Sequence, residues 1–452
     1  MGAFHAYDIR GVYGIDFGAQ EVYRIGYFLP KLLGVKKVLV GRDARLSSDE
    51  IHESLLRGIC DAGADVYDIG LSTTPQVYYA TAKYDFGASV QITASHNSKE
   101  YNGLKISRAQ AMPVGYDSGL NLLEAWIGAG NPAAERLIIP SAQSGKVIPF
   151  SVRDEYLTFL RGYLGDYSNL KIGIDLSNGM AALFIKELLG ETPSYIFDTL
   201  DGTFPNHDPN PLIPKNIKSL QELVVKEQCD IGIIFDGDAD RVMCIDETGC
   251  FISPDLIIGV LGHYFLEEKG LRGPVLQDIR TSKAVGEYLT PMGGEMHTWR
   301  VGRAFAAPKL REINGIYGGE LAGHYYFKDF FYSDSGIMAM LIILDVVGKM
   351  KDRGISVSQL IGRIGQYHNS GEINYKIDNK QEAMELIRDH FVSKETPVSI
   401  YDFDGYRVEF ADWWFNIRPS NTEPYLRFIA EARSKVLLQE KLKTVNRIIQ
   451  SI

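Results

Sequence analysis

Three aspartates alternate with small residues in the segment DGDADR, at Asp236, Asp238 and Asp240. Apolar runs on both sides, CDIGIIF and VMCID, predict a tight loop between two strands. Carboxylates this close repel one another unless a cation lies among them, and oxygen ligands favour Mg²⁺ over Zn²⁺. The alternatives are a solvated acidic turn and an EF-hand. The EF-hand is disfavoured because Arg241 stands where that loop needs glycine, and because strands flank the segment where helices should.

A hydroxyl and an imidazole follow another buried strand, GASVQI, in the segment TASHNSKEYNGLK (93–105). We expect Ser95 at the carboxyl edge of a sheet, where α/β proteins bind ligands. His96 is adjacent in sequence, so we expect it to contact a bound anion rather than to act as a base for Ser95. A returning strand would bring Lys105 back to the same edge. The alternative is a capped turn with solvated polar residues.

Two later segments carry groups suited to binding a sugar phosphate. In GGELAGHYYF, Glu320 and His324 can point into one cleft, where a carboxylate accepts hydrogen bonds from vicinal hydroxyls. In RPSNTEPYLR, Arg418 offers a bidentate fork for phosphate. Donors for the same anion are supplied by Ser420, Asn421 and Thr422. A loop with a structural histidine and a capped turn are the respective alternatives. Together the four segments indicate phosphoryl chemistry on a hydroxyl-rich ligand.

Three stretches of the chain share one pattern of strand, polar turn and helix. They are residues 36–63, 170–190 and 273–289. Continuous apolar strands are typical of parallel sheets buried on both faces, and Ser, Thr or Asn after each strand supplies a helix cap. We interpret this as one α/β unit used three times.

The C-terminal part follows a different pattern, with short alternating strands between helices predicted at 380–391 and 436–449. Asp404-Gly405 predicts a hairpin, so this part is an α+β module. Residues 110–149 lack clear periodicity and are interpreted as a surface helix and a linker. The predicted domains are 1–150, 151–251, 252–368 and 369–452.

The composition of the 452-residue chain is that of a globular protein, with 45% hydrophobic and 23% charged residues. A net charge of −10 makes it a poor general binder of nucleic acid or of membrane surfaces. The four cysteines form no C-x-x-C pair, so we expect reduced, buried thiols in a cytoplasmic protein. The apolar run 337–344 is far shorter than the roughly 20 residues of a membrane span and predicts a buried helix. The N-terminus lacks the pattern of a signal peptide.

The four motifs TASHNSKEYNGLK, DGDADR, GELAGHYYF and RPSNTEP, in this order, closely resemble the α-D-phosphohexomutase superfamily. Within it, the resemblance is to the phosphomannomutase/phosphoglucomutase group and covers essentially the whole chain. It implies an α/β fold, with three similar mixed-sheet domains and a C-terminal α+β domain that form a heart shape around a central cleft. It also implies an isomerase that interconverts hexose 1-phosphates and 6-phosphates of mannose or glucose. No nucleic acid or membrane partner is implied, and the oligomeric state stays open.

The resemblance assigns a role to each motif. Ser95 would carry a phosphoryl group, pass it to a hexose phosphate, and regain one from the resulting hexose 1,6-bisphosphate, which also serves as activator. Mg²⁺ would be held by the phosphoserine, Asp236, Asp238 and Asp240, with Arg241 beside the loop. Glu320 would bind two sugar hydroxyls. The non-reacting phosphate would be held by Arg418, Ser420, Asn421 and Thr422. The transfer site would be surrounded by Tyr7, Arg10, His96, Lys105 and His324, with acid–base work at Lys105 or His324.

The chain departs from the usual motifs at three places. Ser98 replaces a proline after Ser-His-Asn, and Leu321-Ala322 replaces a pair that ends in serine. Arg303 stands where many relatives have histidine, so Arg303 or Arg300 is expected to contact phosphate. A phosphoglucosamine mutase is the alternative within the class, disfavoured by Leu321-Ala322. Outside the class, the candidates are a phosphatase and a non-catalytic hexose-phosphate binding protein.

Overall fold

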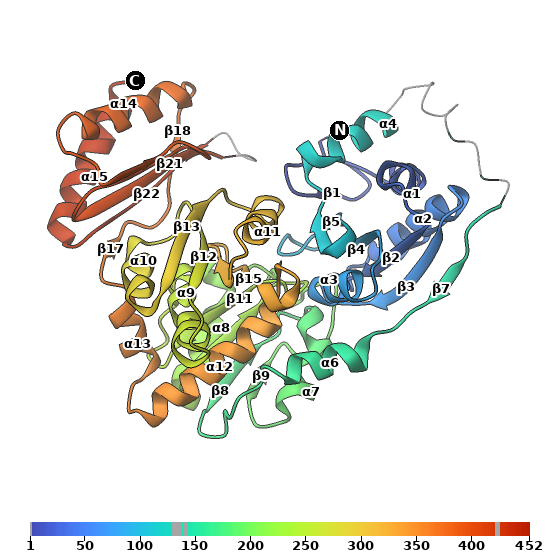
Figure 1. Ribbon diagram of the computed structural model, residues 1–452, viewed down its shortest axis with the longest axis horizontal. Helices are drawn as coiled ribbons and strands as arrows, with labels where there is room; N and C mark the ends of the chain where they lie inside the picture. Colours follow the sequence, from blue (N-terminus) through green and yellow to red (C-terminus); the bar gives the residue numbers. More distant parts are fainter. Residues whose placement is uncertain (1, 129–137, 139–140, 142, 421–424) are drawn as a thin grey trace.

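A computed structural model describes residues 2–128, 138, 141, 143–420 and 425–452. Four β-sheets follow one another along the chain, each covered by helices (Figure 1). In Figure 1 the first sheet lies at the right and the fourth at the upper left, with the second and third between and below them. We call these units the first to fourth modules.

The first module contains a mixed β-sheet and four α-helices among the described residues. Its strands are β1 (Ile9–Val12), β2 (Lys37–Arg42), β3 (Asp65–Leu71), β4 (Ala88–Ile92), β5 (Tyr101–Arg108), β6 (Met112–Pro113) and β7 (Val147–Pro149), and its helices are α1 (Ala19–Leu33), α2 (Ser48–Asp61), α3 (Thr74–Lys83) and α4 (Leu120–Ile127). Strand β2 is parallel to β3 and β4, whereas β5 returns antiparallel to β4. The segment 110–149, predicted to be a surface helix and a linker, contains helix α4 and strand β7.

The second and third modules have mixed sheets of the same kind. The second contains β8 (Ile172–Asp175), β9 (Ser194–Ile196), β10 (Ile231–Phe235), β11 (Val242–Asp246), α6 (Arg153–Arg161), α7 (Ile185–Leu189) and α8 (Lys218–Glu227). The third contains β12 (Gly273–Asp278), β13 (Gly294–Trp299), β14 (Tyr317–Gly319), β15 (Tyr325–Phe327), β16 (Ser333–Asp334), α9 (Pro254–Gly262), α10 (Lys283–Leu289), α11 (Arg303–Glu312), α12 (Gly336–Asp352) and α13 (Val357–Ile364). The parallel pairs β8·β10 and β12·β13 confirm the strand pattern expected from the sequence.

The fourth module is an antiparallel sheet with two helices. It contains β17 (His368–Asn369), β18 (Ile373–Lys376), β19 (Ser399–Tyr401), β20 (Tyr406–Glu409), β21 (Trp413–Pro419), β22 (Tyr425–Ala432), α14 (Lys380–Val392) and α15 (Lys435–Gln450). The predicted hairpin is present, because β19 pairs with β20 and the turn residues Asp404 and Gly405 both have positive φ.

The buried core is distributed unevenly among the modules. One large apolar cluster runs through the second and third modules and includes Tyr78 and Tyr79 of the first. Helix α12 lies within it, so the prediction of a buried helix at 337–344 is confirmed. The fourth module has its own cluster around Trp413 and Phe415. None of the helices in the described ranges is both long and apolar enough to cross a bilayer.

The prediction of buried cysteines is wrong at one position. All four thiols are free; Cys244 is buried in β11, and Cys229 is buried between α8 and β10. Cys250 is exposed because it follows the turn at Thr248-Gly249, beyond the end of β11. Cys60 is half-buried near the end of α2.

Candidate active site

Ser95 lies just beyond the end of β4, where the first module meets the second. It is completely buried, with a left-handed backbone at φ 52°. Its Oγ donates a hydrogen bond to Oδ2 of Asp236 at 2.8 Å. The β4–β5 register sets Lys105 opposite Gln91, so the returning strand brings Lys105 to the same edge, as the sequence predicted. His96 does approach its neighbour, with 3.5 Å between its Nδ1 and the Ser95 Oγ.

The three aspartates form a buried carboxylate cluster in the loop between β10 and β11. Asp236, Asp238 and Asp240 are all fully buried, and one oxygen from each lies within 4.8 Å of the others. The Oδ1 atoms of Asp238 and Asp240 have no hydrogen-bond partner among the described residues. Buried carboxylate oxygens without partners, in a set made only of oxygen ligands, fit a hard divalent ion such as Mg²⁺.

Two groups of the first module hold this loop in place. Lys105 Nζ donates to Oδ2 of Asp238 at 2.6 Å and also bonds Asp240. Thr74, at the start of α3, donates its hydroxyl to Oδ2 of Asp238 at 2.5 Å and its backbone N–H to the Asp238 carbonyl at 3.1 Å. Side chains of the first module therefore hold the carboxylate loop of the second module in place beside Ser95.

Burial and neighbouring charges shift the pKa values of groups around Ser95 and the three aspartates, a region that we call the Ser95 corner. Burial, with the nearby charges of Asp238 and Asp240, raises the pKa of Asp236 well above its ordinary value. Burial and the positive charges of Arg241 and Arg10 lower the pKa of His96 well below its ordinary value. His96 is therefore a neutral ring at physiological pH, suited to hydrogen bonding rather than to ion pairing.

A pocket joins this corner to the third module. The predicted residues that line it are Tyr7, Arg10, Lys105, Asp240, Arg241, Arg303, Glu320 and His324. Glu320 accepts hydrogen bonds from the Tyr326 hydroxyl at 2.6 Å and from the Gly302 N–H at 3.1 Å, one on each carboxylate oxygen. Each oxygen keeps further acceptor capacity, which suits two neighbouring sugar hydroxyls. Ala322, the departure from the usual motif, also lines this pocket.

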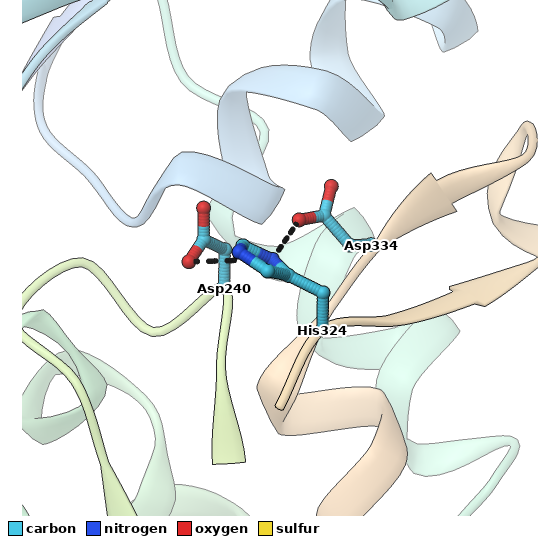
Figure 2. A group of neighbouring side chains, drawn as sticks. All are labelled: Asp240, His324 and Asp334. Carbon is cyan, nitrogen blue, oxygen red and sulfur yellow. Dashed lines mark hydrogen bonds and ion pairs between the residues drawn. The ribbon is translucent and has the colours of Figure 1, made fainter. Parts of the chain in front are cut away.

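His324 lies between two carboxylates from different modules (Figure 2). Its Nδ1 bonds Oδ2 of Asp334 at 2.6 Å and lies 3.8 Å from Oδ1 of Asp240. A carboxylate only accepts, so Nδ1 carries the proton and Nε2 is left for another partner. Asp334 also accepts from Nε of Arg303 at 3.0 Å. Arg303 bonds the Ala111 carbonyl as well and stacks on Tyr78, so its guanidinium is already engaged within the protein.

Arg10 connects the pocket lining to the Ser95 loop, because it donates to Asn97 Oδ1 at 2.9 Å and pairs with Asp8. The remaining predicted residues lie outside the pocket lining. Arg418, in β21, is buried, and its Nε has no hydrogen-bond partner among the described residues. Burial and the nearby charge of Arg280 lower the pKa of Arg418. Ser420 follows β21, and Asn421 and Thr422 lie outside the described residues. Arg300 stacks on Phe305 rather than joining the pocket lining.

Four further residues contact the predicted site residues and were not predicted from the sequence. They are Thr74, Tyr78, Tyr326 and Asp334. A signal was available for two of them, because Thr73-Thr74-Pro75 and Asp334-Ser335 both mark a helix start. Tyr326 belongs to the predicted segment GGELAGHYYF, six residues after its partner Glu320. Nothing local marks Tyr78, whose partner Arg303 comes from the third module.

Family profiles match the chain in four consecutive parts. Their descriptions are phosphoglucomutase/phosphomannomutase alpha/beta/alpha domain I (residues 1–126), domain II (154–249), domain III (253–367) and C-terminal domain (372–447). Together they cover most of the sequence in the order of the four modules.

Curated relatives and solved structures agree with the profiles. The chain is 36% identical over 448 residues to a phosphomannomutase of Escherichia coli, covering 97% of this chain and 96% of that protein. It is 35% identical to the phosphohexose mutases of Xanthomonas campestris, with the same coverage. A phosphoglucomutase/phosphomannomutase family protein from Burkholderia thailandensis superposes with a TM-score of 0.86 at 26% identity, over 100% of this chain and 97% of that one.

Proposed function

The chain belongs to the phosphoglucomutase/phosphomannomutase family of the α-D-phosphohexomutase superfamily, and we propose that it moves a phosphoryl group between the 1- and 6-positions of a hexose through Ser95. As a phosphohexomutase it is an isomerase. Mannose and glucose phosphates are the proposed substrates, and hexose 1,6-bisphosphate is the proposed intermediate and activator. The four domains at 1–150, 151–251, 252–368 and 369–452, and a cytoplasmic location, remain part of this proposal.

One observation carries the proposal: a buried serine hydroxyl is hydrogen-bonded to a three-aspartate cluster that has unsatisfied oxygens. The hydrogen bond alone would suit a structural serine, but the unsatisfied oxygens of the cluster beside it favour a site for a cation. A serine that alternates between hydroxyl and phosphate needs groups that can hold a cation beside it. When bound, Mg²⁺ at Asp236, Asp238 and Asp240 would supply positive charge against the phosphoryl oxygens.

The chain's own residues have distinct parts in the transfer. As the bond between phosphorus and Ser95 Oγ breaks, a bond forms between phosphorus and a sugar hydroxyl oxygen, and that hydroxyl gives up its proton. We assign this proton to Nε2 of His324, because the hydrogen bond to Asp334 fixes its ring with Nδ1 protonated. Ser95 Oγ takes up one proton from water as it leaves as a hydroxyl, and His324 holds the proton released by the sugar. The second half of the reaction runs the same step in reverse at the other end of the hexose.

Recognition of the sugar falls to the third and fourth modules. Glu320 is oriented by Tyr326 and Gly302 and would accept hydrogen bonds from two neighbouring hydroxyls. Arg418 would bind the phosphate that does not react, with Ser420, Asn421 and Thr422 as further donors. Arg303 would act mainly through Asp334 rather than on phosphate, because its guanidinium already has protein partners.

The test offers mannose 1-phosphate, glucose 1-phosphate and glucosamine 1-phosphate separately, with Mg²⁺ and a catalytic amount of bisphosphate. We expect kcat/KM for mannose or glucose phosphate to exceed that for glucosamine phosphate, and the corresponding 6-phosphate to accumulate. Phosphate released to water without the isomeric sugar phosphate would identify a phosphatase instead. Binding of all three without turnover would leave only a hexose-phosphate binding protein.

A further inference from the structure

Arg45 uses every donor of its guanidinium on one loop and on one carboxylate. It lies between β2 and α2, and its side chain is completely buried. Nη2 donates to the carbonyls of Ser95 at 2.9 Å and Asn97 at 2.7 Å, and Nη1 donates to those of Ser98 at 2.6 Å and Tyr101 at 3.0 Å. Nε donates to Asp43 at 3.1 Å. These five bonds exhaust the five N–H groups of the side chain.

The loop held by these bonds needs such support. Ser95 has a left-handed backbone, which is unfavourable for a residue other than glycine unless its surroundings impose it. Its backbone N–H donates to Thr93 Oγ1 at 2.9 Å, and its carbonyl is fixed by Arg45. The direction of the Ser95 Oγ toward Asp236 therefore depends on the peptide groups that Arg45 holds.

Arg45 is itself fixed from two sides. Asp43 accepts the Arg45 backbone N–H at 3.0 Å and the Ser48 hydroxyl at 2.6 Å, so the carboxylate that orients the guanidinium is held in turn. On the other side, the ring of Phe204 from the second module lies 4.9 Å from the guanidinium carbon. Gly202 passes so close that an added Cβ would lie 1.8 Å from the Ala44 carbonyl oxygen.

The held carbonyl of Ser95 also meets the metal loop. A Cβ at Gly237, between two of the aspartates, would lie 2.5 Å from the Ser95 carbonyl oxygen. The peptide group that Arg45 holds thus packs directly on the segment that carries Asp236 and Asp238. A shift of the Ser95 loop would change the distance between the nucleophile and these carboxylates.

We propose that Arg45 is a positioning residue for phosphoryl transfer, fixing the Ser95 hydroxyl against the carboxylate cluster. The inference rests on the proposed function, in which Ser95 carries the phosphoryl group. Arg45 is absent from the residues that line the sugar pocket, so its loss should affect the transfer step and leave substrate binding in place. A residue with a merely structural role would not produce this separation of kcat from KM.

The test compares Arg45→Ala and Arg45→Lys with Arg42→Ala in steady-state assays. We expect kcat to fall about 100-fold in both Arg45 variants, with KM within about threefold of wild type, since a displacement near 1 Å can cost this much. Lysine keeps the charge but offers three donors from one atom, so it cannot replace the planar fork. Guanidinium ion added to Arg45→Ala should raise kcat at least about fivefold. Arg42 pairs with the exposed Asp49, and its variant should keep kcat within about twofold.

The outcomes separate this inference from the proposed function. Thermal unfolding is measured first to show whether each variant folds. If Arg45→Ala does not fold, the kinetic comparison is made with Arg45→Lys. Unchanged kcat, a loss confined to KM, or failure of both variants to fold would each overturn the positioning role. Labelling by ³²P-hexose bisphosphate gives the second readout. Wild-type protein that takes no label at Ser95 contradicts the proposed function and removes the premise. Labelling at equal rates in wild type and variants contradicts only the role of Arg45.

Discussion

The corner around Ser95 and the module that carries Arg418 are held in the protein by different means. The apolar cluster of the second and third modules extends into the first module, which also has a core of its own. Ser95 bonds Asp236, and Lys105 and Thr74 of the first module bond Asp238. The fourth module has a separate core, and hydrogen bonds join it to the third module. Examples run from buried Arg407 to the Thr281 carbonyl at 2.6 Å and from Lys283 to the Phe410 carbonyl at 2.8 Å.

This difference indicates that the two regions contribute to different steps, one to phosphoryl transfer and the other to substrate binding. Interfaces built mainly from polar contacts resemble transient ones, and relative motion is expected across them. We therefore expect a rigid geometry around Ser95, where the phosphoryl group is transferred. We expect the fourth module, where Arg418 would bind the second phosphate, to move relative to the rest of the protein. Substitutions in the Ser95 corner should lower kcat, and substitutions in the fourth module should raise KM. Four substitutions test this expectation, in decreasing order of their predicted effect.

Ser95→Ala should lower kcat by at least about three orders of magnitude, because no other described hydroxyl occupies its place beside Asp236. Binding of hexose phosphate, measured by calorimetry, should change little. Ser98→Ala is the matched control, since Ser98 contributes its backbone carbonyl rather than its hydroxyl to the bond with Arg45. Near-normal turnover in Ser95→Ala would remove this residue as the carrier.

Asp238→Asn should lower kcat by about 10²- to 10³-fold and weaken the dependence of rate on Mg²⁺. The change removes a charge from the cluster and replaces one of the two carboxylate partners of Lys105 with an amide. Rate is measured against Mg²⁺ concentration, with Asp230→Asn, at the opposite end of β10 and paired with Lys351, as control. Kinetics identical to wild type would argue against a metal site in this loop.

Asp334→Asn should lower kcat by about 10- to 100-fold with little change in KM, because His324 loses the carboxylate that fixes its ring. Arg303 loses the same partner, so Arg303→Lys is measured beside it. A similar loss in both variants would mean that Asp334 acts through Arg303. A loss seen only in Asp334→Asn supports the assignment of His324 as the proton acceptor.

Arg418→Ala should raise KM for hexose phosphate by about 10- to 100-fold, the effect of losing a hydrogen bond to a charged group, with kcat within a few-fold. Arg388→Ala, which removes the partner of exposed Asp389 within α14 of the same module, is the control and should change neither constant. A loss in kcat alone would contradict the proposed division between the two regions.

The sequence predicted the parts of the site that depend on neighbouring residues. The spacing of Asp236, Asp238 and Asp240 forces their carboxylates together in one loop, and an antiparallel return of β5 brings Lys105 back to Ser95. Strand and helix positions in the first three modules follow from apolar runs and caps. The helix expected at the end of 170–190 is shorter than predicted, because the chain there first ties Met180 to the Gly237 carbonyl.

Further parts of the site depend on contacts that no local pattern reveals. Asp334 meets His324 through the pairing of β15 with β16, and Arg45 meets the Ser95 loop about 50 residues along the chain. Both look like ordinary cap or turn residues in the sequence. Sugar preference depends in a similar way on a few contacts within the pocket, which distinguish one hexose epimer from another.

The most direct measurement follows phosphorus at Ser95 during turnover. The protein is incubated with ³²P-labelled hexose 1,6-bisphosphate, quenched on the millisecond scale and digested, and the peptide that contains Ser95 is isolated. We predict label on this serine within one turnover and its loss to added unlabelled hexose 1-phosphate at a rate no slower than kcat. Isomerisation that proceeds while Ser95 never acquires label would contradict the account.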